Sequence, residues 1–154
     1  MPLVPTTVMT PPREPGPSST VDVVIPSDPA EARRVQDEIE RLLRAHQASE
    51  KDIFGIRLAL EEALVNAIKH GNQMDRDKKV AIVSVVRAEH FEIHITDEGN
   101  GFDPGDVPDP TAFENIERPC GRGLMLMRHY MSEVAFNARG NAVTMSKVLR
   151  NGKK

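Results

Sequence analysis

The chain has 154 residues, of which 39% are hydrophobic and 28% are charged, as in a soluble globular protein with one core. A formal net charge of −3, an aromatic content of 4% and the absence of Trp argue against direct nucleic-acid binding, which favours basic surfaces and aromatic platforms. Cys120 is the only cysteine and no apolar run could span a bilayer, so we expect a cytoplasmic protein without membrane contact.

The first residues of the chain have a composition that does not favour a packed structure. Residues 1–20 contain six prolines and little patterned apolar sequence, so we expect a disordered leader before a single domain at 21–150. Val21–Ile25 is a β-branched run that predicts a strand. Apolar residues at helical spacing then predict a helix over 29–46, with Pro29 suited to its first turn.

A second helix is expected over 50–70, ending at Gly71 as its C′ residue. The period then changes to that of strands. Lys79–Arg87 and Phe91–Thr96 are separated by three residues and predict an antiparallel hairpin.

The C-terminal part combines a long loop with a helix and two strands. Residues 99–121 show no sustained periodicity, and a loop of this length is usually functional or mobile. A third helix is expected over 122–131, followed by strands at Glu133–Asn137 and Ala142–Val148. This order of elements predicts an α/β two-layer sandwich, with a mixed or antiparallel sheet covered on one face by helices.

Glu62 and Asn66 are one helical turn apart, so their side chains are neighbours on one flank of the second helix. An Asn carboxamide oxygen can bind Mg²⁺, and a nearby carboxylate can orient or deprotonate an attacking hydroxyl. The alternative is an ordinary solvated flank. Glu61 points about 100° away and is expected at the surface or in an ion pair.

Asp97 ends a strand in which Phe91, Ile93 and Ile95 alternate with polar residues, so parity places it on the apolar face. A buried carboxylate needs a partner, and the exocyclic amine of an adenine is one candidate. The alternative is a turn or capping acid at a strand end. Gly99 and Gly101 favour a ligand site because small residues let a ring approach closely.

Gly121-Arg122-Gly123 precedes the third expected helix, whose N-terminus could bind phosphate oxygens with help from the Arg122 guanidinium. The chain has no GxxxxGK[ST] motif, so this is not a P-loop. A flexible hinge is the alternative reading of these glycines.

Together the three segments resemble the GHKL ATPase superfamily with its Bergerat-type ATP site, and in particular the bacterial anti-sigma factor serine/threonine-protein kinases. These kinases regulate general-stress and sporulation sigma factors. The resemblance covers about residues 21–149, with Glu62–Asn66 similar to the N box, Asp97–Phe102 to the G1 box and Gly121–Leu124 to the G2 box.

The resemblance implies a site for ATP and Mg²⁺, with Glu62 as the general base, Asn66 as the Mg²⁺ ligand and residues 103–120 as a lid. Asp97 would read the adenine amino group, and the Gly121–Gly123 segment would face the phosphates. The residues that would contact the nucleotide are Asn66, Asp97, Gly99, Gly101, Phe102, Gly121, Arg122, Gly123 and Leu124.

The function implied is an anti-sigma factor kinase that transfers the γ-phosphate of ATP to a Ser or Thr of an anti-sigma-factor antagonist and sequesters a sigma factor, as a homodimer. The alternative is a catalytically weak, nucleotide-responsive regulator that binds proteins. The proline-rich lid and the short G2 box depart from the family pattern. A histidine kinase would need a dimerisation helix carrying an acceptor His, which the leader does not offer.

Overall fold

The computed structural model describes residues 18–99 and 119–149, without the side chains of residues 119–122. The elements in chain order are β1 (Ser19–Pro26), α1 (Pro29–Ala45), α2 (Glu50–Val65), the π-helical turn η2 (Asn66–Gly71), β2 (Lys79–Val86), β3 (His90–Asp97), α4 (Pro119–Tyr130), β4 (Glu133–Phe136) and β5 (Ala142–Val148).

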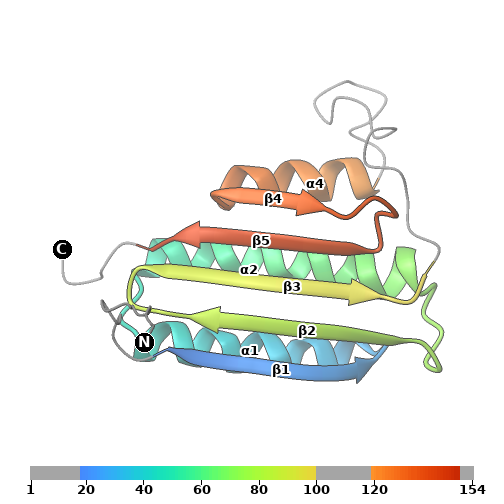
Figure 1. The fold of residues 1–154 in the computed structure, drawn as a ribbon, viewed down its shortest axis with the longest axis horizontal. Helices are drawn as coiled ribbons and strands as arrows, with labels where there is room; N and C mark the ends of the chain where they lie inside the picture. The colour runs from blue at the N-terminus through green and yellow to red at the C-terminus, as the bar shows by residue number, and fades with distance from the viewer. Residues whose placement is uncertain (1–17, 100–118, 150–154) are drawn as a thin grey trace, which may run out of the picture.

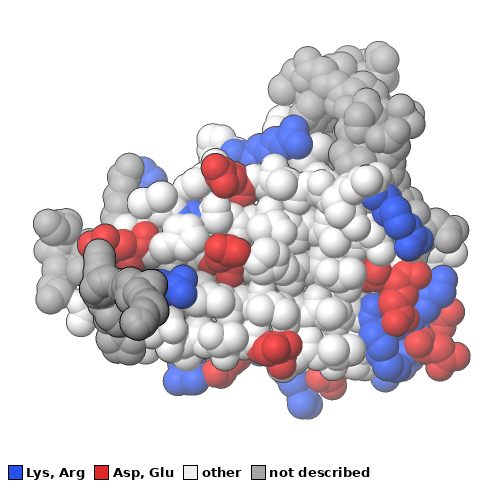
Figure 2. Space-filling model, in the orientation of Figure 1, with Lys and Arg blue, Asp and Glu red and all other residues white. Residues whose placement is uncertain are grey.

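The strands form one antiparallel sheet in the order β1-β2-β3-β5-β4, and the helices lie against one of its faces (Figure 1). The expected α/β two-layer sandwich is confirmed, with the antiparallel form of the sheet. The hairpin is also confirmed, since Val86 pairs with Phe91 across it. The outer face of the sheet carries few charged side chains (Figure 2).

Strand parity decides which side chains enter the core. In β3 the residues Phe91, Ile93 and Ile95 are buried against the helices, while His94 and Thr96 face outward and are exposed. Burial of each large apolar side chain contributes roughly 1.5–3 kcal/mol. The same parity carries Asp97, at the end of β3, to the helix side, where it is 8% exposed. The expected orientation of Asp97 is therefore confirmed.

The N-termini of α1 and α2 are each capped by a side chain that accepts a backbone hydrogen bond. Asp28 caps α1 by accepting a hydrogen bond from the Ala30 N–H at 2.9 Å, with Pro29 as the first helical residue. Ser49 caps α2 by accepting from the Asp52 N–H at 3.0 Å. The first strand begins earlier than expected, because Ser19 and Thr20 pair with Val86 and Val85 of β2.

The second helix differs from the expected continuous α-helix over 50–70. Its α-helical part ends at Val65, and η2 continues with π geometry to Gly71. Gly71 is not the left-handed C′ residue that the sequence predicts. Asn72 closes the helix with φ of −88°, and among the described glycines only Gly140 has a positive φ. A π turn is rare and frequently marks a functional site.

The third expected helix also begins earlier, at Pro119 rather than residue 122. Gly121-Arg122-Gly123 therefore lies inside the first turns of α4 and not ahead of the helix. Glycine is a poor helix former, but tertiary packing overrides propensity, and α4 packs closely along α2 at Gly123. Among the described residues, no helix is long and apolar enough to cross a membrane.

Candidate functional site

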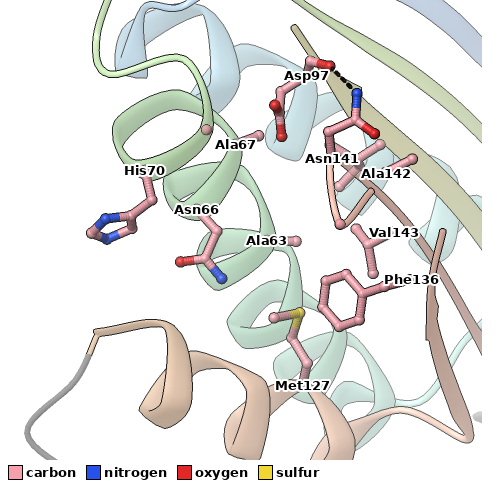
Figure 3. Close-up of a pocket in the computed structure, with 13 residues that line it drawn as sticks. Ala63, Asn66, Ala67, His70, Asp97, Met127, Phe136, Asn141, Ala142 and Val143 are labelled. Atoms are coloured by element: carbon pink, nitrogen blue, oxygen red, sulfur yellow. Dashed lines mark hydrogen bonds between the residues drawn. The ribbon is translucent and has the colours of Figure 1, made fainter. Parts of the chain in front are cut away.

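A cavity of about 140 Å³ lies on the helix side of the sheet, between α2–η2, the end of β3, α4 and the β4–β5 turn (Figure 3). Its volume is close to that of the roughly 150 Å³ cavity that accepts benzene in an engineered protein. Its walls are mostly apolar. The lining residues are Ala63, Asn66, Ala67, His70, Gly71, Ile95, Asp97, Met127, Phe136, Gly140, Asn141, Ala142 and Val143. The cavity can therefore hold one flat ring system.

The polar groups of the cavity are placed unevenly. Figure 3 shows Asp97 at one end and Met127 at the other, with Asn66 and His70 along the helix and Phe136 and Val143 along the strands. A ring bound between these walls would present one edge to the Asp97 carboxyl group. Apolar walls with a few placed polar groups are typical of small-molecule sites.

Asp97 is held at the cavity end by its own backbone neighbours. Its Oδ1 accepts a hydrogen bond from the Gly99 N–H at 2.8 Å, and the described residues give Oδ2 no such partner. Burial raises the pKa of Asp97, against the lowering effects of the Gly99 N–H and of the Arg139 and Lys78 charges. A buried acceptor of this kind can receive a hydrogen bond from an exocyclic amine.

Two glycines allow η2 and the end of β3 to meet. A Cβ atom on Gly71 would lie 2.5 Å from the Asp97 Cγ atom, and one on Gly99 would lie 1.9 Å from the Gly71 carbonyl oxygen. A side chain at position 99 would clash with backbone, and one at position 71 would displace the Asp97 carboxyl group. The sequence predicts Gly99 as a site residue because a ligand ring could approach it closely. In the structure the group that approaches Gly99 is the backbone of Gly71, which the sequence analysis interprets only as the end of a helix.

Asn72 is a structural residue that the sequence does not single out. Its fully buried amide donates to Ser27 Oγ at 2.9 Å and to the Lys79 carbonyl at 3.0 Å, and it accepts from the Glu98 N–H at 2.8 Å. It thereby ties the end of η2 to three strand ends. Its position directly after the helix glycine is the only sequence signal that could have found it.

The β4–β5 turn supplies the remaining wall. Asn141 donates from Nδ2 to the Asp97 carbonyl at 3.1 Å, and the Asp97 N–H donates to the Asn141 carbonyl at 2.9 Å. Gly140 has φ of 76°, a conformation that favours glycine. The two hydrogen bonds to Asn141 therefore help to fix the position of Asp97 in the cavity.

A second cluster joins Glu62, Asn66 and Gly123. A Cβ atom on Gly123 would lie 2.7 Å from Glu62 Oε1 and 3.4 Å from Asn66 Nδ2. The glycine of α4 thus stands directly against the carboxylate and the amide of the α2–η2 helix. Two of the three segments singled out in the sequence meet at this point, and Asn66 also lines the cavity that contains Asp97.

Other predicted site residues are placed differently or cannot be placed. Leu124 is buried in the core and is not among the lining residues of the cavity. Glu61 is exposed and accepts from Gln36 Nε2 at 3.1 Å, as expected for a surface residue. Gly101, Phe102 and lid residues 103–118 lie outside the described residues, as does the side chain of Arg122.

Comparisons with known proteins show the family of the chain. A family model described as "Histidine kinase-like ATPase domain" matches residues 25–147. The chain belongs to this family. The resemblance to the GHKL superfamily and its anti-sigma factor kinases is thereby confirmed at the level of the family.

Two relatives of this histidine kinase-like ATPase domain are Bacillus proteins named "Serine-protein kinase RsbW". The B. subtilis protein is 32% identical over 110 residues, 67% of this chain and 68% of that protein. The B. velezensis protein is 30% identical over 149 residues, 89% of this chain and 91% of that protein.

More distant matches cover less of the known proteins. The Bordetella bronchiseptica serine/threonine-protein kinase BtrW is 27% identical over 88 residues, 56% of this chain and 62% of that protein. This alignment therefore spans less than two thirds of BtrW. The crystal structure of the RsbU and RsbW domains of a Mycobacterium tuberculosis protein matches with a TM-score of 0.59 and 17% identity, covering 86% of this chain and 33% of that chain. It supports the fold alone.

Proposed function

We propose that this domain binds Mg-ATP in the cavity, transfers the γ-phosphate to a Ser or Thr hydroxyl of an anti-sigma-factor antagonist, and sequesters a sigma factor. The observation that carries the proposal is the pairing of a buried carboxyl group, at the end of a ring-sized apolar cavity, with the Glu62–Asn66–Gly123 cluster on the same helix side. In this proposal the buried carboxyl group recognises the base of the nucleotide, and the Glu62–Asn66–Gly123 cluster takes part in phosphoryl transfer.

Asp97 is proposed to accept a hydrogen bond from the adenine amino group through the oxygen that the Gly99 N–H leaves available. The adenine ring would lie between the helix wall at Ala63 and Ala67 and the strand wall at Val143. Gly71 and Gly99 contribute by bringing the carboxyl group to this depth. An acceptor at the end of apolar walls therefore fits a purine with an exocyclic amine.

At the phosphate end, Asn66 is proposed to offer its carboxamide oxygen to the cation, and Gly121, Arg122 and Gly123 in the first turns of α4 to face the phosphates. Mg-ATP supplies the phosphoryl group and the charge neutralisation. Glu62 would take the proton of the acceptor hydroxyl as the new P–O bond forms and the bond to ADP breaks. Positioning and electrostatics carry most of such a transfer.

The sigma-factor partner is proposed from the name of one relative, and the antagonist from the family resemblance. That relative is the Oceanobacillus iheyensis anti-sigma F factor, which is 32% identical over 108 residues, 66% of this chain and 73% of that protein. An anti-sigma-factor antagonist is accordingly proposed as the phosphoacceptor and a sigma factor as the sequestered partner. The homodimer implied by the resemblance is tested by sedimentation equilibrium with and without nucleotide.

The experiment has a binding arm and a transfer arm. Mg-ATP at about a hundred times its Kd should stabilise the fold by roughly 2.7 kcal/mol and raise Tm, and Asp97→Ala should abolish the rise. In the transfer arm, γ-labelled ATP is supplied with purified anti-sigma-factor antagonists from the same organism. Label should enter one of them with wild type and not with Glu62→Gln, which should still bind nucleotide.

The two arms separate the outcomes. No Tm shift at millimolar Mg-ATP would remove the nucleotide site from consideration. A normal shift without transfer to any antagonist would support the alternative of a nucleotide-responsive binding regulator, for which Glu62→Gln would change nothing. Equal transfer by wild type and Glu62→Gln would show that another group accepts the proton.

A further inference from the structure

The helices α2 and α4 pack along a seam that has a different chemistry at each end. At one end Gly123 of α4 stands against Glu62 of α2. At the other end Tyr130 of α4 packs on Gly55, where an added Cβ would lie 2.9 Å from the Tyr130 ring. The side chains that we group as the α2–α4 seam are Phe54, Leu58 and Glu62 on α2 and Leu126 and Tyr130 on α4.

Phe54 is the most conspicuous member of the seam. It is 58% exposed, although it is a large apolar side chain in the N-terminal part of a helix that is otherwise well packed. Its ring meets the Tyr130 ring edge to face, with centroids 6.1 Å apart, and His129 meets Tyr130 in the same way at 4.6 Å. Tyr130 thus holds Phe54 in one orientation while leaving its outer surface open.

The seam leads from this aromatic group to the proposed catalytic carboxylate. Phe54, Leu58 and Glu62 follow one another at i, i+4 and i+8 and form one ridge of α2. Leu58 and, on α4, Leu126 are half-buried between the two ends. Eight residues of helix span about 12 Å.

This distance has a consequence for any protein that presents a hydroxyl to Glu62. A specific protein–protein interface covers about 800 Å² on each partner, which for a circular patch corresponds to a radius of about 16 Å. A patch of that size centred on Glu62 reaches Phe54. Scattered exposed apolar residues are normal, and Val24 on the outer sheet face is another at 63% exposure, but only Phe54 shares a helix ridge with Glu62 among the described residues.

The charge beside Phe54 is positive. Lys51 is exposed and lies one helical turn before Phe54, while the neighbouring acids are already engaged. Glu50 pairs with Arg44, and Asp52 is buried with Lys147 Nζ 3.9 Å away. A complementary partner surface therefore presents an apolar side chain flanked by carboxylates.

We infer that the α2–α4 seam is the docking surface for the phosphoacceptor protein, with Phe54 as its aromatic anchor and Lys51 as its charge contact. The inference rests on the proposed kinase function and adds the place at which the protein substrate binds. Aromatic anchor side chains that fill a pocket on the partner commonly carry a large share of the binding energy.

The test uses the full chain, Mg-ATP and, as the probe, the purified antagonist that takes up label from wild type. Phe54→Ala should raise the KM for the antagonist roughly ten-fold or more, with kcat and the KM for ATP within about two-fold of wild type. Val24→Ala removes an equally exposed apolar side chain on the opposite face and should change none of the three constants. Phe54→Tyr keeps the ring and should restore most of the lost affinity.

Lys51→Glu tests the charge of the partner. It should raise the KM for the antagonist several-fold at low salt, with the effect shrinking toward wild type as ionic strength rises to about 0.5 M. An unchanged antagonist KM in Phe54→Ala, with active wild type, would overturn the docking surface and leave the kinase function standing. Absence of transfer by wild type would overturn both.

Discussion

The carboxyl group of Asp97 occupies the space in which a side chain on Gly71 would begin, 2.5 Å from the position of its Cβ atom. Asp97 at the end of β3 and Gly71 at the end of η2 are 26 residues apart in the chain, and each restricts which residue can occupy the other position. The missing side chain of Gly71 lets the acid sit at the cavity end. The acid in turn makes any larger residue at position 71 costly.

Gly99→Ala should be strongly destabilising. The new Cβ would stand 1.9 Å from the Gly71 carbonyl oxygen, a backbone atom that cannot rotate away, so we expect a loss of about 3 kcal/mol or more in the free energy of unfolding. Gly140→Ala provides the comparison, since its positive φ predicts a loss of about 1–2 kcal/mol. Urea denaturation measures both, and equal losses would contradict the backbone clash.

Asp97→Asn should stabilise the nucleotide-free protein, more so as the pH rises. Burial raises the pKa of Asp97, so the folded state holds that proton more tightly than the unfolded state. The stability that this proton contributes is full below the unfolded pKa of about 3.9 and is lost as the pH rises through the raised folded value. Asn keeps an acceptor for the Gly99 N–H and carries no charge.

The difference in unfolding free energy between the Asp97→Asn variant and wild type is the quantity to follow, by urea titrations from about pH 4 to pH 8. It should grow with pH across the window above the unfolded pKa and then become constant. A difference that shrinks as the pH rises would mean that the carboxylate is stabilised in the fold. The same variant should bind adenine nucleotides more weakly, which would be a trade of function against stability.

Gly123→Ala should impair transfer without impairing folding. The added methyl would meet Glu62 Oε1 at 2.7 Å, and because that oxygen ends a flexible side chain it would be displaced rather than clash with backbone. Loss of a positioned base costs roughly 10²–10⁴-fold in rate. Glycine is also about 1 kcal/mol worse than alanine in a helix, so Tm should hold or rise.

Single-turnover transfer with labelled ATP checks the Gly123→Ala prediction, with Met125→Ala as a half-buried control on the same helix. A wild-type rate in Gly123→Ala would show that the glycine is not needed beside Glu62. A lowered Tm would mean that the helices cannot absorb the methyl group.

Asn72→Ala should cost about 3 kcal/mol, because it removes the three hydrogen bonds of a fully buried amide to Ser27, Lys79 and Glu98. Gln73→Ala, next in the chain and exposed, should change stability by less than about 0.5 kcal/mol. Differential scanning calorimetry compares the two. Similar Tm values would mean that water replaces the Asn72 contacts at little cost.

The fold was predictable because its signals are local and periodic. Alternation in Phe91–Asp97 gives both the strand and the face of Asp97, and helical spacing gives the core side of α2. The errors lie at element ends. Pro119 begins α4 inside a segment with loop composition, and only the packing of Gly123 on α2 explains why two glycines are helical there.

The candidate site was predictable where motif residues carry their own chemistry, as Glu62, Asn66 and Asp97 do. It was not predictable where a residue acts through a distant partner. Gly71 matters because of Asp97, and Asn72 because of Ser27 and Glu98, none of which is near it in the sequence. Contacts of that kind emerge only once the strands are aligned.

The π geometry of η2 makes the candidate site sensitive to the number of residues in this turn. A π turn accommodates one residue more than an α-helical path of the same rise. Deleting a single residue between Asn66 and Gly71 would let the segment relax to an ordinary α-helix of the same rise. The helix wall opposite Asp97 would then lose its π turn, and the cavity that these residues line would change shape with it.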